Sequence, residues 1–278
     1  HILLDSLQKI CLMHGMEVDY YKKLFQTIGN IIELIEKDDI PKYLLFLENA
    51  FPYMDNYNYH KGMNGIIQEL TELLKTKNIG TDSDRALLLD FQATLETKPE
   101  KAIKLEKDAL AQIENITADN ARLVSNLHAN LGGLYRMNAH PDLAREHMEK
   151  SISLLDQFNL LHINDSIPQI ANYAMFLTEQ QEPERGISEL QKLSGIIKEY
   201  HSDDCLDYAK VQETLGTIYL MTANLPQAKT HFKRAFKIYE KIWADEPEMI
   251  EAKYQEIQEL YPQIGFCIGK NLSGLLTK

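Results

Sequence analysis

The sequence is poor in cysteine, glycine and proline. Its 278 residues include 3 Cys, 13 Gly and 9 Pro. The cysteines (Cys11, Cys205 and Cys267) form neither a disulfide framework nor a CxxC metal pair, which favours a reducing, cytoplasmic compartment. Glycine and proline gather at the joints between apolar segments, so long helices are expected. No run of eighteen apolar residues is present, and we therefore predict no membrane span.

Positive charge is also in short supply. Lys and Arg number 29 against 41 Asp and Glu, a net charge of −12. This balance argues against a nucleic-acid partner and suits a basic protein or peptide, although acidic surfaces also serve solubility alone. The chain contains no GxxxxGK[ST], GxGxxG or GxSxG motif, and His140 and His147 have no third metal ligand nearby in sequence. We therefore predict no enzyme activity, no catalytic residues, no cofactor and no metal.

What the sequence does contain is a helical hairpin near its C-terminal end. Leu215 and Tyr219 share one helical face, and Gly216 leaves room beside them. The break at Asn224-Leu-Pro226 precedes a second helix with its own apolar face. The residues of that second face are Ala228, Phe232 and Ala235.

This hairpin recurs with a step of 42 residues. One series of equivalent positions holds large residues, and a second holds small ones: Leu215, Tyr173, Leu131 and Leu89, and Ala228, Gly186, Ala144 and Ala102. Proline marks each joint, at positions 99, 141, 183 and 226. A constant step over several units indicates a repeat array, in which each hairpin buries its apolar face against its neighbours.

We expect two regions along the chain. Residues 81–278 are predicted to hold about four 42-residue repeats and a C-terminal capping helix in 262–278. Residues 1–80 are predicted to form two degenerate hairpins that continue the solenoid, or alternatively a separate small helical domain. Since the chain starts with His1 and not Met, we expect it to be part of a longer protein.

The segments 130–135 and 214–219, followed by Ala228, Phe232 and Ala235, resemble tetratricopeptide repeats (TPRs). The long step and the run 235–243 look like the kinesin-light-chain variety, and similar arrays form the sensor ends of STAND-class signalling ATPases. The resemblance implies an all-α fold, a right-handed α-solenoid whose first helices line a concave face that binds proteins or peptides. One departure is that the bulky fourth residue of the first helix is replaced by His128, Ile170 and Gln212.

In TPR arrays that grip extended peptides, an asparagine before the Leu-Gly pair often faces the groove. Asn130 and Asn172 stand at that position, and Thr214 replaces the third copy. Such an amide both donates to and accepts from a peptide backbone. The same repeat register predicts that further side chains face the groove: Asn126, Arg136, Met137, Met175, Glu179, Lys210, Glu213, Thr217 and Met221. The alternative is that these side chains only connect neighbouring helices.

The first functional hypothesis is a non-enzymatic scaffold that holds an extended protein or peptide segment in this groove. The alternative is a peptide- or ligand-sensing regulatory domain of a larger signalling ATPase or transcriptional regulator, which an upstream P-loop or helix-turn-helix domain would favour. A third hypothesis is an enzyme with a site in residues 1–80, which clustered residues of perturbed pKa would favour.

Overall fold

The computed structural model describes residues 37–45, 47, 60–163 and 166–260. Within these ranges the secondary structure is helical, with no strand. The predicted helices before residue 37 and the predicted capping helix in 262–278 lie outside the described residues. The all-α class and the antiparallel hairpins predicted from the repeat are confirmed.

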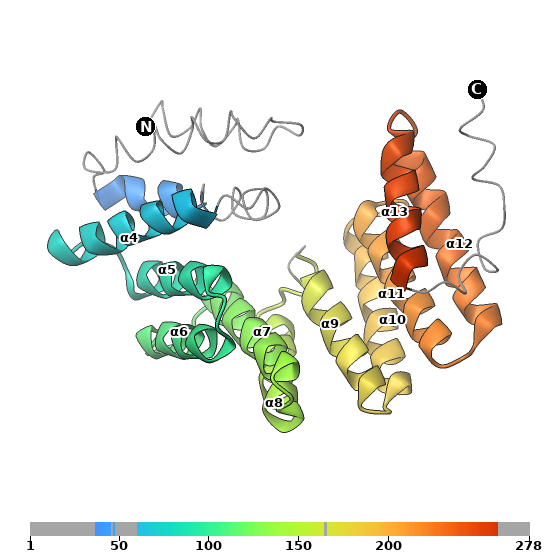
Figure 1. Ribbon diagram of the computed structural model, residues 1–278, viewed down its shortest axis with the longest axis horizontal. Helices are drawn as coiled ribbons and strands as arrows, with labels where there is room; N and C mark the ends of the chain where they lie inside the picture. Colours follow the sequence, from blue (N-terminus) through green and yellow to red (C-terminus); the bar gives the residue numbers. More distant parts are fainter. Residues whose placement is uncertain (1–36, 46, 48–59, 164–165, 261–278) are drawn as a thin grey trace. The chain divides into compact units, whose positions relative to one another are not determined.

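The chain divides into two compact units, residues 1–140 and 141–278. The first contains η2 (Lys37–Asp39), helical residues 40–45, α4 (His60–Thr76), α5 (Asp82–Leu95), α6 (Pro99–Gln112) and α7 (Ala121–Met137). The second contains α8 (Pro141–Gln157), α9 (Ser166–Glu179), α10 (Pro183–Tyr200), α11 (Leu206–Met221), α12 (Leu225–Ile242) and α13 (Pro247–Leu260). Figure 1 shows these helices along the chain, from blue to red.

The turns that follow α7, α9 and α11 share one backbone geometry. Ala139, Gln181 and Ala223 are 42 residues apart, and each has a positive φ, of 57°, 65° and 58°. The next backbone N–H in each turn donates to a carbonyl five residues back, as in Asn224 to Tyr219 at 2.7 Å. These are Schellman-type helix ends built without glycine. The 42-residue step therefore repeats the turn as well as the helices.

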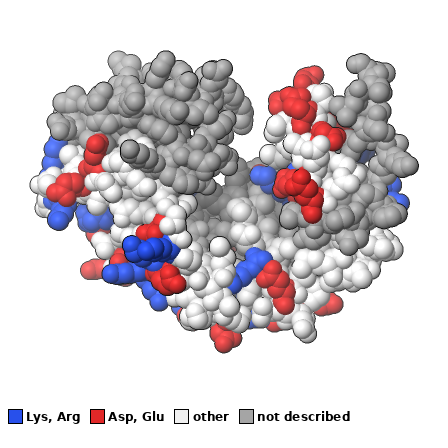
Figure 2. All heavy atoms as spheres, in the orientation of Figure 1, with Lys and Arg blue, Asp and Glu red and all other residues white. Residues whose placement is uncertain are grey.

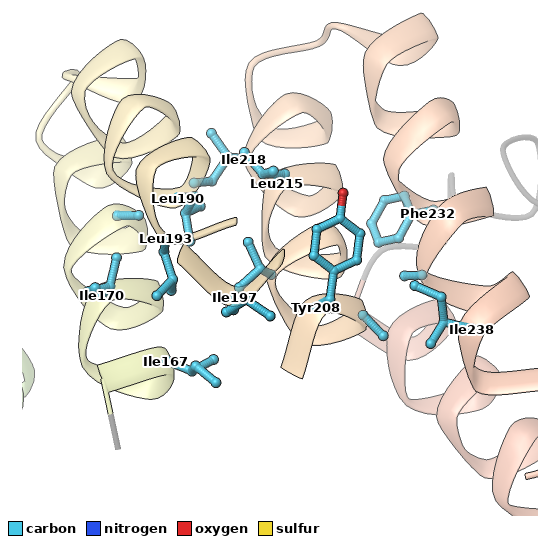
Figure 3. Packing of buried hydrophobic residues seen from close by; sticks show 14 of the residues in the cluster. Ile167, Ile170, Leu190, Leu193, Ile197, Tyr208, Leu215, Ile218, Phe232 and Ile238 are labelled. Carbon is cyan, nitrogen blue, oxygen red and sulfur yellow. The ribbon is translucent and has the colours of Figure 1, made fainter. Parts of the chain in front are cut away.

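The predicted packing register is confirmed by burial. Ala102, Ala144, Gly186 and Ala228 are all buried, as are Leu131, Tyr173 and Leu215, whereas Leu89 is half-buried. In the unit 141–278, apolar side chains of α9, α10, α11 and α12 meet in one continuous core (Figure 3). A second core, in the unit 1–140, joins residues 40–47 to α4 and α5.

Two glycines mark close approaches between the helices of a hairpin. A Cβ atom on Gly186 of α10 would lie 2.7 Å from the carbonyl oxygen of Ala174 on α9. A Cβ atom on Gly216 of α11 would lie 3.0 Å from the ring of Phe232 on α12. Small residues at these positions let the two backbones of each hairpin pack together.

Candidate functional site

The first helices α9 and α11 lie in contact in the unit 141–278 and carry many of the predicted groove residues. On α9, Asn172 and Glu179 are exposed, whereas Met175 is half-buried against the core of the unit. The side chain of Asn172 has no hydrogen-bond partner among the described residues. Its amide is therefore open to an incoming donor or acceptor.

On α11, Lys210 is exposed and lies 3.8 Å from Asp207 on its own helix. Thr217 is half-buried, and Met221 is 43% exposed near the end of the helix. We use the name first-helix face for the surface of α9 and α11 formed by Asn172, Met175, Glu179, Lys210, Thr217 and Met221. These six predicted residues lie on two adjacent helices, and all are at least partly accessible.

Glu213 of α11 is held by two neighbours. It accepts a 2.6 Å hydrogen bond from the hydroxyl of Tyr239 on α12 and pairs with Lys253 of α13 at 3.0 Å. Burial by itself would lower the pKa of Lys253. The negative charges of Glu213 and Glu256 outweigh this effect of burial and raise the pKa of Lys253. The repeat pattern does not reveal Lys253 or Tyr239 as partners of Glu213. This predicted groove residue therefore connects three helices.

Acidic side chains dominate α13. It carries Glu248, Glu251, Glu256 and Glu259 against the single Lys253. Figure 2 shows Asp and Glu side chains gathered over this helix. The local potential there is negative, in keeping with the net charge of −12.

The other predicted groove residues lie on α7, in the unit 1–140. Met137 is 80% exposed, and Asn126 and Arg136 are half-exposed and make contacts of their own. Asn130 is exposed, and its side-chain Nδ2 donates a 2.8 Å hydrogen bond to Oδ1 of Asp90 on α5. Asn130 is thus partly engaged within the fold, unlike its counterpart Asn172.

Asp90 and Asn130 also contact Glu106 of α6, which is only 1% exposed. Burial raises the pKa of Glu106 well above its usual range, and the like charge of Asp90 raises it further, whereas the Asn130 amide lowers it. This acid pair was not among the residues predicted from the sequence. The signal was available, because the 42-residue step places both acids where other copies have small or apolar residues.

A polar network in the unit 141–278 joins α8, α9 and α10. The hydroxyl of Tyr173 donates to Glu149 at 2.8 Å and accepts from Arg185 at 3.0 Å. Glu182 pairs with Arg145 at 2.6 Å and with Arg185 at 2.9 Å, and hydrogen bonds from these two arginines lower its pKa. These groups satisfy one another, which fits a role in holding the helices.

Neither a metal cluster nor a membrane-spanning helix is found in the described part of the chain. No group of three or more His, Cys, Asp and Glu side chains there is placed to hold a metal ion. None of its helices combines the length and the apolar character needed to cross a bilayer.

Comparison with known proteins agrees with this geometry. Residues 166–241, which span α9 to α12, match the family model described as tetratricopeptide repeat. This part of the chain carries TPR repeats. No curated protein sequence is significantly similar to the chain.

Solved structures with TPR-like folds resemble the chain at low sequence identity. BtubC (BKLC) from P. vanneervenii is 17% identical, with a TM-score of 0.53 over 81% of this chain and 84% of that one. A putative kinesin light chain of Podosopora anserina, with nearly identical TPR-like repeats, is 15% identical, with a TM-score of 0.53 over 71% and 96%. A Rap protein complexed with Competence and Sporulation Factor is 16% identical, with a TM-score of 0.54 over 96% and 75%.

These likenesses confirm the predicted TPR fold, including its similarity to the kinesin-light-chain variety. The TPR fold supports a role as a protein-interaction scaffold, and TPR repeats are in general non-enzymatic. The relation to STAND-class proteins, the division at residue 80 and the groove residues stay predictions.

Proposed function

We propose that this TPR array is a non-enzymatic scaffold that binds an extended, basic segment of a partner protein on its first-helix face. The observation that carries the proposal is Asn172, an exposed amide on α9 without a hydrogen-bond partner among the described residues. A carboxamide can donate to one peptide carbonyl and accept from one peptide N–H, whatever side chains the peptide carries. This chemistry suits an extended backbone.

The surroundings of Asn172 support a mixed binding surface. Met175 and Met221 offer flexible apolar contacts that can repack around different side chains. Glu179 and the acids of α13 favour a partner with positive charge. The Rap protein of similar fold is complexed with Competence and Sporulation Factor. By analogy, this supports the hypothesis that the present array binds a partner.

The test is selection of binding peptides from a random display library against the full chain, followed by affinity measurement with variants. Asn172→Ala is expected to weaken the selected peptides about tenfold, since about one backbone hydrogen bond is lost. Gln191→Ala, an exposed polar residue on the second helix α10, is the matched control.

Thermal unfolding of the same variants separates binding from folding. Asn172→Ala is expected to leave the midpoint almost unchanged, because its side chain has no partner to lose. A large drop in the midpoint would mean that the amide is structural. Equal peptide affinity for wild type, Asn172→Ala and Gln191→Ala would refute the proposed face.

A further inference from the structure

The unit 1–140 contains a pocket of about 410 Å³ that is lined by side chains of α4, α5 and α6 and of the turn after α4. Helix α5 packs against both of the other helices and lies between them (Figure 1). Pockets that bind small molecules in proteins have volumes of about 300–1,000 Å³. This pocket is therefore large enough for a small organic ligand.

The apolar part of the lining consists of three leucines. Leu74 of α4 and Leu88 of α5 are buried, whereas Leu89 of α5 is half-buried. In the 42-residue repeat Leu89 corresponds to Leu131 and Leu215, which are only 0% and 1% exposed. A position that packing closes in other hairpins thus stays open to the pocket here. An apolar group in the pocket would remove this leucine surface from water, which is favourable.

The charged part of the lining is positive. Among the described residues it includes Lys75 and Arg85 and no acid, although the chain as a whole has a net charge of −12. The guanidinium of Arg85 donates to Asp82 at 2.6 Å and to the carbonyl oxygen of Gly80 at 3.4 Å. Lys75 is exposed and has neither an ion pair nor a hydrogen bond within the described part of the chain. Because Asp82 compensates Arg85, one uncompensated positive charge remains at the pocket.

The neutral polar side chains of the lining include an unused donor. Nε2 of Gln92 on α5 donates to Oγ1 of Thr71 on α4 at 3.3 Å, so these two groups serve the contact between their helices. The side-chain amide of Asn78, in the turn after α4, has no hydrogen-bond partner among the described residues. The lining therefore offers an ammonium group and an amide N–H beside an apolar surface.

We propose that this pocket binds a small organic acid with one negative charge and an apolar body. The carboxylate accepts hydrogen bonds from Lys75 and Asn78, and the apolar chain or ring lies against the three leucines. One uncompensated cation suits a monocarboxylate better than a phosphate group, which carries up to about two negative charges. This inference goes beyond the proposed function, because the pocket lies in the unit 1–140 and uses no residue of the first-helix face.

Methyl NMR of the full chain tests the site with defined probes. Leucine ¹³C-methyl resonances are followed while 4-phenylbutyrate, its uncharged amide or acetate is added at constant pH and ionic strength. The resonances of Leu74, Leu88 and Leu89 are expected to shift and to saturate with 4-phenylbutyrate. The amide should bind at least about tenfold more weakly because it lacks the charge-assisted hydrogen bond. Acetate should also bind at least about tenfold more weakly, because it lacks the apolar body.

Two matched variants test the role of the lysine. Lys75→Gln should weaken the binding of 4-phenylbutyrate at least about tenfold. Lys104→Gln should leave it unchanged, because this exposed lysine of α6 does not line the pocket. Both variants replace an exposed side chain, and leucine spectra that match wild type without ligand show that both are folded.

Saturable shifts of the three leucines that depend on the carboxylate and on Lys75 would support the proposal. The absence of saturable shifts, equal affinity for the acid and the amide, or equal affinity of wild type and Lys75→Gln would overturn it. The titration uses no peptide and no residue of α9 or α11, so its result does not depend on whether the first-helix face binds a partner.

Discussion

Replacing Glu106 by glutamine should change how the stability of the unit 1–140 depends on pH. The substitution keeps the shape of the side chain and a hydrogen-bond donor toward Asp90, but the amide cannot titrate. In the folded chain, burial and the charge of Asp90 raise the pKa of Glu106, so it stays protonated near neutral pH. In the unfolded chain a glutamate has a pKa of about 4.3 and is ionised. The folded state therefore binds one more proton.

The size of the effect follows from this one proton. The stabilisation from the extra proton on Glu106 is fully present below the pKa that Glu106 has in the unfolded chain. It is lost as pH rises toward the raised pKa of Glu106 in the folded chain, at up to about 1.4 kcal/mol per pH unit. Between pH 6 and pH 8 the wild type should lose about 2–3 kcal/mol through this group. Glu106→Gln lacks this loss, so the difference in stability between the two proteins should widen steadily with pH.

The assay is urea unfolding followed by far-ultraviolet circular dichroism from pH 5.5 to pH 8.5, with hydrogen exchange of α5 to α7 as the local measurement. Asp108→Asn is the control, because this acid is exposed on the same helix. Glu106→Met, which installs the apolar residue found at Met148, should stabilise the protein by about 1–4 kcal/mol at pH 8. Stability curves for wild type and Glu106→Gln that run parallel across this range would mean that Glu106 is not protonated in the folded chain.

Three further predictions concern the unit 141–278, where the single tryptophan reports unfolding by fluorescence. Gly186→Ala should destabilise the unit by about 1–3 kcal/mol, because its new Cβ meets a backbone carbonyl. Gly195→Ala on the same helix has open space around the new Cβ and should stabilise the unit by about 0.5–1 kcal/mol. The opposite order of stabilities would contradict the packing. Ala228→Leu should overpack its hairpin and cost about 1–3 kcal/mol, and a neutral result would count against the register. Lys253→Met should lower the free energy of unfolding by about 1.5–3 kcal/mol, because Glu213 loses its charged partner. An unchanged urea midpoint would contradict this prediction.

The hairpin register was predictable because it depends on local periodicity. Ala228 and Phe232 recur at helical spacing, and each hairpin buries the same face against its neighbour. The prolines that start the second helices have the same origin, since a helix's first turn has no intrahelical partner for its N–H groups. The turns at Gln181 and its equivalents were not predictable from composition, because none of these turns contains a glycine.

The candidate site was only partly predictable for a physical reason. Asn130 and Asn172 are equivalent in sequence, yet Asn130 donates to Asp90, which lies 40 residues away, and Asn172 does not have such a partner among the described residues. Glu213 likewise finds Tyr239 across 26 residues of chain. A repeat pattern cannot distinguish these cases, because the partner comes from another helix and its distance is set by packing.

The repeat pattern of the sequence is enough to predict an array of stacked helical hairpins, since a constant step of small and large residues leaves few other ways to bury them. The pattern does not reveal which polar side chains find a partner on another helix, nor that Glu106 is buried beside a second acid; both depend on how the helices pack. Burial and charge act through space, so two residues that match in the repeat can differ fully in their chemistry.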